Sequence, residues 1–485
     1  MSDGTSSTRD RAAFAAREVG VVASAVGVLL VALAGRYGYH RDELYFLQAG
    51  RHLAWGYPDQ PPLVPLVAHV MDTIAPGSLV VLRLPSALAA TAIVVIAGLI
   101  ARELGARRSG QVVAAASTGL SGVVLGTGHL LSTATISMLG WACATLLLVR
   151  LLQGTSGLRD WWVLGALAGA TMQANLLIVA LVAALGVAVL VVGPRELFAR
   201  AGPYLAVLVA AVVVAPYVVW QAAHGFPQVH IADSIANGGS GSSQSRWAFL
   251  PFQLLQQGPP LAPLWITGLV VLLRDRTLRV LGLTYLVLAV LFLVAGGKPY
   301  YLSGLYPLLL AAGAQPFLDR VRSWVVPVLL VASLPTVVIV LPVLPAHDEN
   351  GIVALNYDAG ETIGWPAYVD QVAAVYRTLP AGTAILTGNY GEAGAVDRYG
   401  GSRGLPAAYS GHMGFWFWGP PPGSVPVLAI GIDPVLLSSS CASTTVVGKL
   451  HEVHGIENDE DGTPLVLCSA PRRPWAGLWK RFERH

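Results

Sequence analysis

Charged residues are scarce in this chain of 485 residues: Asp, Glu, Lys and Arg together make up 12%, and lysine occurs at only three positions. A soluble domain carries about 25% charged residues, so the composition excludes an ordinary soluble protein. Hydrophobic residues make up 54% and the mean hydropathy is +0.61. They form runs separated by short polar stretches, and roughly 20 apolar residues cross a bilayer. The formal net charge of +3, spread over loops, gives nucleic-acid binding little support.

Cysteine is also rare, with three residues in the whole chain. Cys143 lies in an apolar run and is expected to be inert. Cys441 and Cys468 lie near the C-terminus, where a disulfide is compatible with an extracytoplasmic location. The sequence contains no P-loop, H-E-x-x-H or paired C-x-x-C, and no G-x-S-x-G with a plausible triad. Acids and arginines are few inside the apolar runs, which argues against ion-coupled transporters and voltage sensors.

Eleven apolar runs are predicted to span a membrane. Arginine-bearing segments precede the first run and follow the second, fourth, sixth, eighth and tenth. With eleven spans, all of these segments fall on one side, which the positive-inside rule assigns to the cytoplasm. The fifth and sixth runs share one continuous apolar stretch, so the number of spans is open by one pair. The predicted spans are residues 14–35, 80–101, 110–128, 130–149, 161–176, 177–193, 203–221, 251–273, 278–296, 299–316 and 323–344.

The outer side then receives a long first loop, about residues 36–79, and everything after about residue 345. Residues 1–345 are predicted to form a transmembrane domain. In residues 346–485, short β-like runs alternate with helical stretches, which predicts a small α/β domain with a partly parallel sheet. The predicted fold class is therefore an α-helical polytopic plasma-membrane protein, with about 11 transmembrane helices and a C-terminal extracytoplasmic α/β domain. Residues 236–246 are rich in Gly and Ser, which indicates either a linker or a mobile loop that closes over a site.

Two adjacent carboxylates, Asp42 and Glu43, follow the first predicted span. Charges at the edge of a bilayer are costly, so a functional role is expected. On a helix, adjacent side chains point about 100° apart, so that one can enter a site while the other caps the backbone or holds a basic partner. A carboxylate that faces a hydroxyl can act as a general base. The alternative is that the pair only caps a helix or pairs with Arg41.

Several motifs with aromatic or charged residues recur at predicted outer positions, and the set extends along nearly the whole chain. They are Tyr39-His40-Arg41-Asp42-Glu43-Leu44-Tyr45, Tyr57-Pro58-Asp59-Gln60-Pro61-Pro62-Leu63, Arg83-Leu84-Pro85-Ser86, Trp220-Gln221-Ala222-Ala223-His224-Gly225, Gly297-Lys298-Pro299-Tyr300-Tyr301 and Gly388-Asn389-Tyr390-Gly391-Glu392-Ala393-Gly394. The set resembles the GT-C class of membrane glycosyltransferases. The nearest match is glycosyltransferase family 39, the protein mannosyltransferase and aminoarabinose transferase group, in its actinobacterial form.

This resemblance implies a GT-C fold and a reaction. A sugar moves from a polyprenyl-phosphate-linked donor to a hydroxyl of a protein, a lipid or a cell-wall glycan at the outer face of the membrane. Asp42 is the implied general base, with Glu43 beside it. Lys298, the only lysine in the membrane half, is the first candidate for holding the donor phosphate, although a lysine at a span end can also snorkel. The further substrate-binding candidates are Tyr301, Asp59, Gln60, Arg83, Arg246, His129 and His224.

For several of these candidates, a purely structural role is the alternative: Arg83 as an interfacial anchor, and the two histidines as satisfied hydrogen-bond donors. The sequence also departs from the relatives. Gln60 replaces a lysine, and Ser137 and Asn175 replace an acid and a lysine. The last two changes indicate a jointly lost ion pair, altered chemistry or lost activity. Lost activity corresponds to a non-catalytic lipid-binding or lipid-translocating protein that kept the fold. No cofactor is certain, and a divalent metal, Mg²⁺ or Mn²⁺, on Asp42 and Glu43 stays open.

Overall fold

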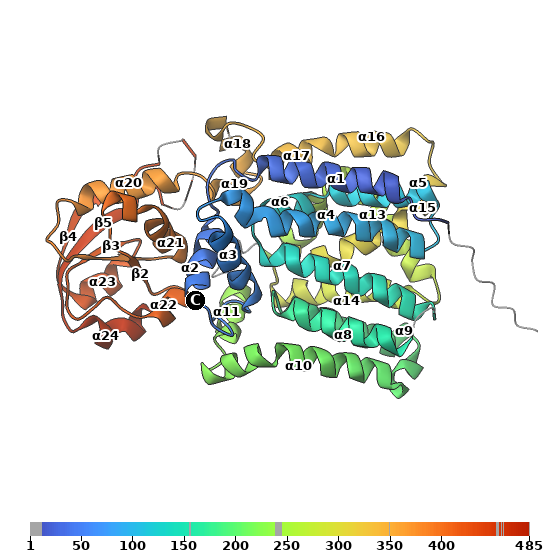
Figure 1. Ribbon diagram of the computed structural model, residues 1–485, viewed down its shortest axis with the longest axis horizontal. Coiled ribbons are helices and arrows are strands. Elements are labelled where there is room, and N and C mark those ends of the chain that lie inside the picture. Colours follow the sequence, from blue (N-terminus) through green and yellow to red (C-terminus); the bar gives the residue numbers. More distant parts are fainter. Residues whose placement is uncertain are drawn as a thin grey trace, which may run out of the picture.

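The computed structural model describes residues 12–484 except 155–156, 238–244, 349, 453–454, 457 and 459. Two parts lie side by side in Figure 1, a bundle of apolar helices and a smaller α/β unit formed by the C-terminal residues. The short helices α2 (Arg41–Arg51), α3 (Leu63–Ile74) and α11 (Pro227–Ala236) lie between the two parts. The predicted architecture, a helical bundle followed by an α/β unit, is confirmed.

Each of the eleven predicted spans coincides with a helix or with a broken helix. These are α1 (Ala16–Leu33), α4 (Leu79–Glu103), α5 (Arg108–Gly119) with α6 (Gly122–His129), α7 (Thr133–Leu152), α8 (Leu158–Met172), α9 (Leu177–Val192), α10 (Ala201–Ala223), α12 (Phe249–Gln257) with α13 (Ala262–Arg274), α14 (Arg279–Ala295), η4 (Pro299–Leu305) with α15 (Tyr306–Leu318), and α16 (Val325–Ala332) with α17 (Leu334–Val340).

The lengths of these helices vary widely. Among the described residues, four helices are long and apolar enough to cross a membrane: α1, α4, α7 and α10. The pair α5 and α6, bent by 54°, would make a fifth span, and further apolar helices of 10–17 residues include α9 and α14. The number of crossings therefore stays a prediction.

The arginine-bearing turns meet at one end of the bundle. Arg107, in the turn between α4 and α5, pairs with Asp319 after α15. Arg150, at the end of α7, donates to Glu103 at the end of α4 over 3.0 Å. Because α1 runs from this end towards α2, the short helices and the α/β unit lie at the opposite end.

The α/β unit contains one five-stranded sheet with the order β2-β1-β3-β5-β4. β1 pairs in parallel with β2 and β3, whereas β5 pairs antiparallel with β3 and β4, so the predicted partly parallel sheet is confirmed. The sequence pattern missed β2, because three residues are too few to show an alternation. The strands are β1 (Ala384–Thr387), β2 (Ala408–Ser410), β3 (Val427–Ile430), β4 (Cys441–Lys449) and β5 (Pro464–Pro471); the helices are α18 (Asn350–Val353), α19 (Tyr357–Gly360), α20 (Trp365–Tyr376), α21 (Tyr390–Tyr399), α22 (Gly414–Trp418), α23 (Pro434–Ser440) and α24 (Trp475–Leu478).

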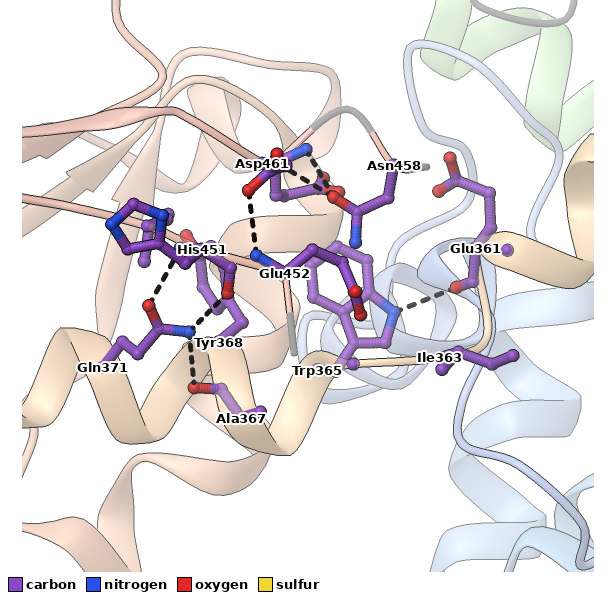
Figure 2. A pocket seen from close by; sticks show the side chains of 14 residues that line it. Glu361, Ile363, Trp365, Ala367, Tyr368, Gln371, His451, Glu452, Asn458 and Asp461 are labelled. Atoms are coloured by element: carbon purple, nitrogen blue, oxygen red, sulfur yellow. Dashed lines mark hydrogen bonds between the residues drawn. The ribbon is translucent and has the colours of Figure 1, made fainter. Parts of the chain in front are cut away.

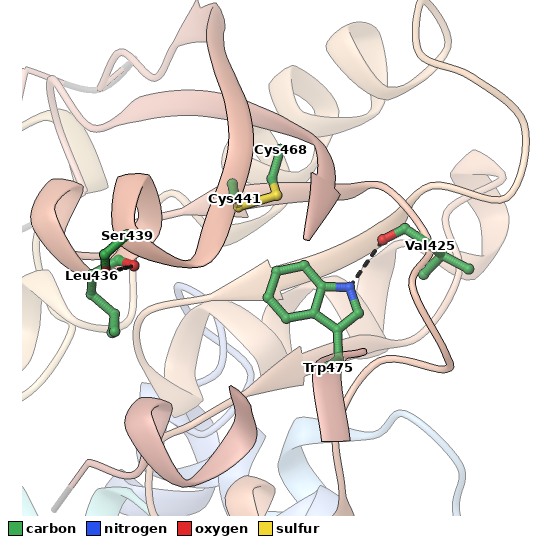
Figure 3. Close-up of a disulfide and its surroundings, with 6 residues drawn as sticks. All are labelled: Val425, Leu436, Ser439, Cys441, Cys468 and Trp475. Atoms are coloured by element: carbon green, nitrogen blue, oxygen red, sulfur yellow. Dashed lines mark hydrogen bonds between the residues drawn. A yellow bond between two sulfur atoms is a disulfide. The ribbon is translucent and has the colours of Figure 1, made fainter. Parts of the chain in front are cut away.

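A disulfide joins the two antiparallel strands at one edge of this sheet (Figure 3). Cys441 begins β4 and bonds to Cys468 in β5, with the two Cα atoms 5.8 Å apart. The β4–β5 register shifts next to this position, so the covalent bond holds the strands together where the ladder is irregular. The buried indole of Trp475 lies nearby and donates from Nε1 to the Val425 carbonyl over 2.9 Å. The remaining cysteine, Cys143, is free.

The α/β unit contacts the rest of the chain mainly through α21, which packs on α2. Two glycines of α21 make this close approach sterically allowed. A Cβ atom at Gly391 would lie 2.8 Å from the Cβ of Arg41, and one at Gly394 would lie 2.8 Å from the Cβ of Leu44. Leu44 and Trp365, from opposite sides of the contact, belong to one apolar core. The two parts therefore share packed side chains at the position of the conspicuous acidic motif.

Candidate active site

The N-terminus of α2 fixes the directions of Asp42 and Glu43. His40 is the N-cap residue, and its Nδ1 accepts a hydrogen bond from the Asp42 backbone N–H over 3.2 Å. The Glu43 carboxylate in turn accepts from the His40 backbone N–H over 2.9 Å, which completes a capping box. Asp42 and Glu43 thus occupy the second and third helical positions and point in different directions.

Glu43 points into the protein, where it meets Arg83 of α4. The Arg83 Nε donates to Oε1 of Glu43 over 2.9 Å and its Nη2 donates to Oε2 over 2.8 Å, with the two side chains only 1% and 0% exposed. The Leu131 backbone N–H also donates to Oε1 over 2.9 Å. Burial opposes ionisation of Glu43, but the Arg83 guanidinium outweighs it and holds the pKa of the carboxyl below its usual range. Both Glu43 oxygens are hydrogen-bonded within the protein, which favours a structural role for Glu43, and its part in catalysis or metal binding stays a prediction.

Arg83 is equally committed. Beside the two bonds to Glu43, Nη1 donates to the Ala34 carbonyl over 2.9 Å and Nη2 to the Gly38 carbonyl over 2.7 Å. Nη1 also lies 3.3 Å from Nε2 of His129, which is itself buried. All three guanidinium nitrogens are engaged, which favours a structural role for Arg83, and its binding of a lipid phosphate stays a prediction. His129 is part of this buried polar network.

Asp42 points the other way, towards α21. Its Oδ1 accepts a hydrogen bond from the Tyr390 hydroxyl over 2.7 Å. Nδ1 of His40 lies 3.9 Å from Oδ2, and 45% of the Asp42 side chain remains exposed. Partial burial opposes ionisation, but His40 and Arg41 outweigh it, so the pKa of Asp42 lies below its usual range. Asp42 is thus an ionised and accessible carboxylate, held in place by a neutral hydroxyl.

Arg41 precedes Asp42 but is held by the α/β unit. Its Nε lies 3.3 Å from Oε2 of Glu361, and its guanidinium lies 5.7 Å from the centre of the Tyr357 ring. Glu361 lines a cleft of the α/β unit, where its backbone carbonyl accepts from Nε1 of Trp365 over 2.9 Å (Figure 2). The Arg41 side chain therefore pairs with Glu361. The hydrogen bond to the Asp42 carboxylate comes from Tyr390 instead.

Lys298 occupies the sharp turn between α14 and η4, where Gly296 adopts a positive φ of 70°. Burial lowers the pKa of Lys298, while the carboxylates of Asp42 and Asp358 act in the opposite direction. The ammonium group is therefore close enough to Asp42 for their charges to interact, although residues 42 and 298 are far apart in the sequence. Tyr301, one turn further on, packs edge-on against the ring of Phe292.

Asp59 and Gln60 lie in the loop between α2 and α3. The Tyr45 hydroxyl donates to Oδ1 of Asp59 over 2.6 Å and accepts from the Gly414 backbone N–H over 3.1 Å. Burial raises the pKa of Asp59 to about 7, so its carboxyl can donate or accept a hydrogen bond near neutral pH. Gln60 is 3% exposed, and neither polar atom of its side-chain amide has a hydrogen-bond partner among the described residues. Buried polar groups are normally satisfied, so the Gln60 amide is a candidate for contact with a ligand.

Two predicted candidates do not join this site. His224 is exposed at the end of α10, where its ring stacks on Trp220 at 4.0 Å and Nδ1 lies 2.7 Å from the Trp220 carbonyl. Arg246 is exposed in a short 3-10 helix, η2 (Arg246–Ala248), and no hydrogen bond or ion pair connects it to a described residue of the site. Most of the predicted Gly/Ser segment lies outside the described residues.

The sequence pattern assigned no role to Tyr390, although this residue belongs to one of the quoted motifs. Asparagine at a helix start, followed three residues later by glutamate, signals a capping box, and Asn389 and Glu392 form one. That signal puts Tyr390 at the first helical position but says nothing of its contact with Asp42. Among the described residues, no three or more His, Cys, Asp or Glu side chains lie close enough together to hold a metal ion.

Comparisons with known proteins agree with this fold. Residues 59–220 match the family model of dolichyl-phosphate-mannose-protein mannosyltransferases. ArnT from Cupriavidus metallidurans bound to undecaprenyl phosphate has a similar structure, with a TM-score of 0.61 at 16% identity over 93% of this chain and 98% of ArnT. Apo ArnT gives 0.59 at 15% identity over 93% and 96%. Mycobacterial arabinofuranosyltransferase AftD gives 0.50 at 17% identity over 94% of this chain and 42% of AftD. Curated proteins give no match.

These matches confirm the resemblance to GT-C membrane glycosyltransferases and the predicted GT-C fold. The identities are low, so the structural likeness bears on the fold, and the roles of individual residues depend on the geometry described above.

The buried Glu43–Arg83 pair predicts a large and specific effect on stability. Glu43→Gln leaves the Arg83 guanidinium buried without its counter-charge, which costs roughly 3–5 kcal/mol. We expect a much lower thermal unfolding temperature for the purified full chain in detergent. Asp42→Asn is the matched control, since it makes the same carboxyl-to-amide change one residue away at a partly exposed position. Equal losses of stability in the two variants would contradict the structural role of Glu43.

Proposed function

We propose that this chain, which has the GT-C fold, is a glycosyltransferase that moves a sugar from a polyprenyl-phosphate-linked donor to an acceptor hydroxyl, with Asp42 as the general base. The observation that carries the proposal is the state of Asp42. Its carboxylate is ionised, 45% exposed and oriented by the Tyr390 hydroxyl, with the Lys298 ammonium within electrostatic range. The undecaprenyl phosphate bound to ArnT, a protein of the same fold, supports this class of donor.

The chemistry suits these groups. A lipid phosphate is already a good leaving group at neutral pH, so it needs stabilisation of its charge more than protonation. Lys298 supplies a positive charge, and the buried Gln60 amide supplies a donor that has no hydrogen-bond partner among the described residues. Asp42 would remove the proton from the acceptor hydroxyl as the oxygen attacks the anomeric carbon, on the side opposite to the departing phosphate.

We also propose that the sugar is transferred at the outer face of the membrane. The arginine-bearing turns gather at the end of the bundle remote from the α/β unit, and arginine is enriched on the cytoplasmic side of membrane proteins. Disulfides persist in oxidising, extracytoplasmic environments, and the α/β unit contains the Cys441–Cys468 bond. These two independent features support a plasma-membrane protein whose residues after about 345 form an extracytoplasmic domain.

If the protein bound lipid without catalysing a reaction, the Asp42 carboxylate would be expected to have different surroundings. A carboxylate without a chemical role is expected to be buried or tied to a cation, as Glu43 is. Asp42 instead has a neutral hydroxyl as its hydrogen-bond donor and a large exposed fraction. This contrast between two adjacent carboxylates favours the enzyme.

The assignment of Asp42 predicts the outcome of a conservative substitution. Asp42→Asn keeps the size and the hydrogen bond with Tyr390 but removes the base, so transfer is expected to fall by about 10²–10⁴-fold with donor binding retained. The measurement uses reconstituted protein, radiolabelled polyprenyl-phosphate sugars and acceptor membranes from a deletion strain. Asp358→Asn, which removes a nearby charge that is 65% exposed, is expected to have a much smaller effect. Full activity of Asp42→Asn would exclude Asp42 as the base.

Replacement of Tyr390 by phenylalanine is predicted to change the pH dependence of kcat/KM. Its hydrogen bond stabilises the charged form of Asp42, so Tyr390→Phe raises the pKa of that carboxyl, and the acidic limb of kcat/KM moves to higher pH. The same hydroxyl also orients the carboxylate, and misplacement of a catalytic group is costly, so kcat/KM is expected to fall by about ten- to a hundred-fold. Tyr376→Phe is the control, since its hydroxyl donates to Thr383 within the α/β unit. A lower rate with an unshifted pH profile would argue against direct action on Asp42.

Labelling of cysteines in intact cells tests the orientation. After mild reduction, Cys441 and Cys468 are expected to react with a membrane-impermeant maleimide, because the α/β unit faces the outside. Cys143, in α7 of the bundle, serves as the internal control and should not react. Labelling of Cys441 and Cys468 only after permeabilisation would place the α/β unit in the cytoplasm.

A further inference from the structure

The cleft drawn in Figure 2 lies between α20 and the turn that joins β4 to β5. Two reciprocal hydrogen bonds hold this turn on the helix. The His451 backbone N–H donates to Oε1 of Gln371 over 2.9 Å, and Nε2 of Gln371 donates to the His451 carbonyl over 2.8 Å. The cleft has a free volume of about 30 Å³, which is room for about two or three groups of the size of a water molecule. A group of a few atoms fits into it, whereas a sugar ring does not.

The residues that carry a formal charge on the walls of this cleft are acids. They are Glu361, Glu452, Glu460 and Asp461, and no lysine or arginine belongs to the described lining. Two cations border the cleft. Arg41 pairs with Glu361 over 3.3 Å, and Cε of Lys449 lies 3.4 Å from the position of a Cβ atom at Gly462. The acids outnumber these cations, so the field within the cleft favours a positively charged group.

Tyr368, which also lines the cleft, gives the independent sign of a ligand. It is 6% exposed, and its hydroxyl has no hydrogen-bond partner in the part of the chain that the structure describes. The charges of Glu460, on the wall of the cleft, and of the buried Glu392 act on this hydroxyl, so the polar end of the ring lies near the acids. A buried hydroxyl without a partner is costly, and its oxygen can accept a hydrogen bond from a donor that enters the cleft.

The spacing of the acids favours an organic cation over a metal ion. A metal ion such as Ca²⁺ needs several oxygen ligands that converge on one point. Across the described ranges, no three His, Cys, Asp or Glu side chains lie close enough together for that. An ammonium group carries three donors that reach separate acceptors, and it is also attracted to aromatic faces. The cleft offers both, since the rings of Trp365 and Tyr368 on its wall meet edge-on with their centres 5.7 Å apart.

We propose that this cleft is a second ligand site of the protein and that it binds the primary ammonium group of a dissolved ligand, such as a lysine side chain. The inference does not depend on the proposed function, because it requires neither a sugar donor nor transfer. The ammonium group would donate to the Tyr368 hydroxyl and to carboxylates of the wall. All described lining residues belong to the α/β unit, which favours a ligand from the aqueous phase over a lipid head group.

A ligand in this cleft would lie beside the contact between the two parts of the chain. Glu361 lines the cleft and pairs with Arg41 of α2, the residue before Asp42. Trp365 also lines it, and Cη2 of its ring lies 3.4 Å from the position of a Cβ atom at Gly391 of α21. The cleft is therefore a site separate from Asp42 that touches the same two helices.

Binding of a lysine side chain to the full chain tests this inference. The protein in phosphatidylcholine nanodiscs is titrated by calorimetry with Nα-acetyl-lysine methylamide, and with the same compound acetylated at Nε, which is neutral. We expect saturable binding of the first compound and at least about ten-fold weaker binding of the second, as for the loss of a hydrogen bond to a charged group. Equal binding of the two compounds, or no saturable binding of either, would overturn the inference.

Two competitors identify the chemistry of the site. At constant ionic strength, neither Ca²⁺ nor phosphatidylethanolamine added to the nanodiscs is expected to displace the lysine compound. Displacement by Ca²⁺ would show a metal site, and displacement by phosphatidylethanolamine would show a site for a lipid head group. Either result would overturn the assignment to a dissolved ammonium ligand.

Two tyrosine variants of α20 locate the binding in the cleft. Tyr368→Phe is expected to weaken binding of the lysine compound by about ten-fold, without lowering the thermal unfolding temperature, because the hydroxyl has no partner among the described residues. Tyr376→Phe is the matched control on the same helix. Its hydroxyl donates to the carbonyl of the buried Thr383 over 2.6 Å, so its loss is expected to lower the unfolding temperature and leave binding unchanged. Unchanged binding in Tyr368→Phe, or equal weakening in the two variants, would overturn the inference.

Discussion

The arrangement of this protein depends on one buried ion pair, between Glu43 and Arg83. Around it gather backbone groups from four places in the chain: the carbonyls of Ala34 and Gly38, and the N–H groups of His40 and Leu131. Two charges that are almost fully buried would be unfavourable without such compensation. Here every polar atom of the two charged side chains has a hydrogen-bond partner, so the network fixes how α2 lies on α4 and on the α6–α7 turn. The orientation of every other residue of α2 follows from this.

Asp42 gains its position from that constraint. One side of the α2 N-terminus is held by the ion pair, and the other side is covered by α21, whose two glycines allow close contact and whose Tyr390 reaches the carboxylate. A site supported from both sides on helices is held more precisely than one on a loop. The α/β unit is therefore part of the candidate active site, since it supplies the hydroxyl that orients Asp42, the proposed base, and the carboxylate of Glu361 that holds Arg41.

The candidate site also brings opposite charges together. Asp42 and Lys298 are far apart in the sequence, yet their charges interact in the folded chain. In the proposed reaction, the cation would compensate the charge of the departing phosphate, while the carboxylate would remove the proton of the acceptor hydroxyl.

The sequence by itself determined the helical membrane class, the partly parallel C-terminal sheet and the motif that carries Asp42, because hydropathy, periodicity and short motifs are local properties of the chain. It also indicated that Asp42 and Glu43 diverge, since helical geometry alone separates adjacent side chains. Which of them would be buried, and that Arg83 would be consumed by an ion pair, depended on residues 40 positions apart meeting in space. The contact of Tyr390 with Asp42, across 348 positions, had no local signal. Only the tertiary structure decided these points, because hydrogen bonds and ion pairs are set by distances between atoms, which a linear pattern does not contain.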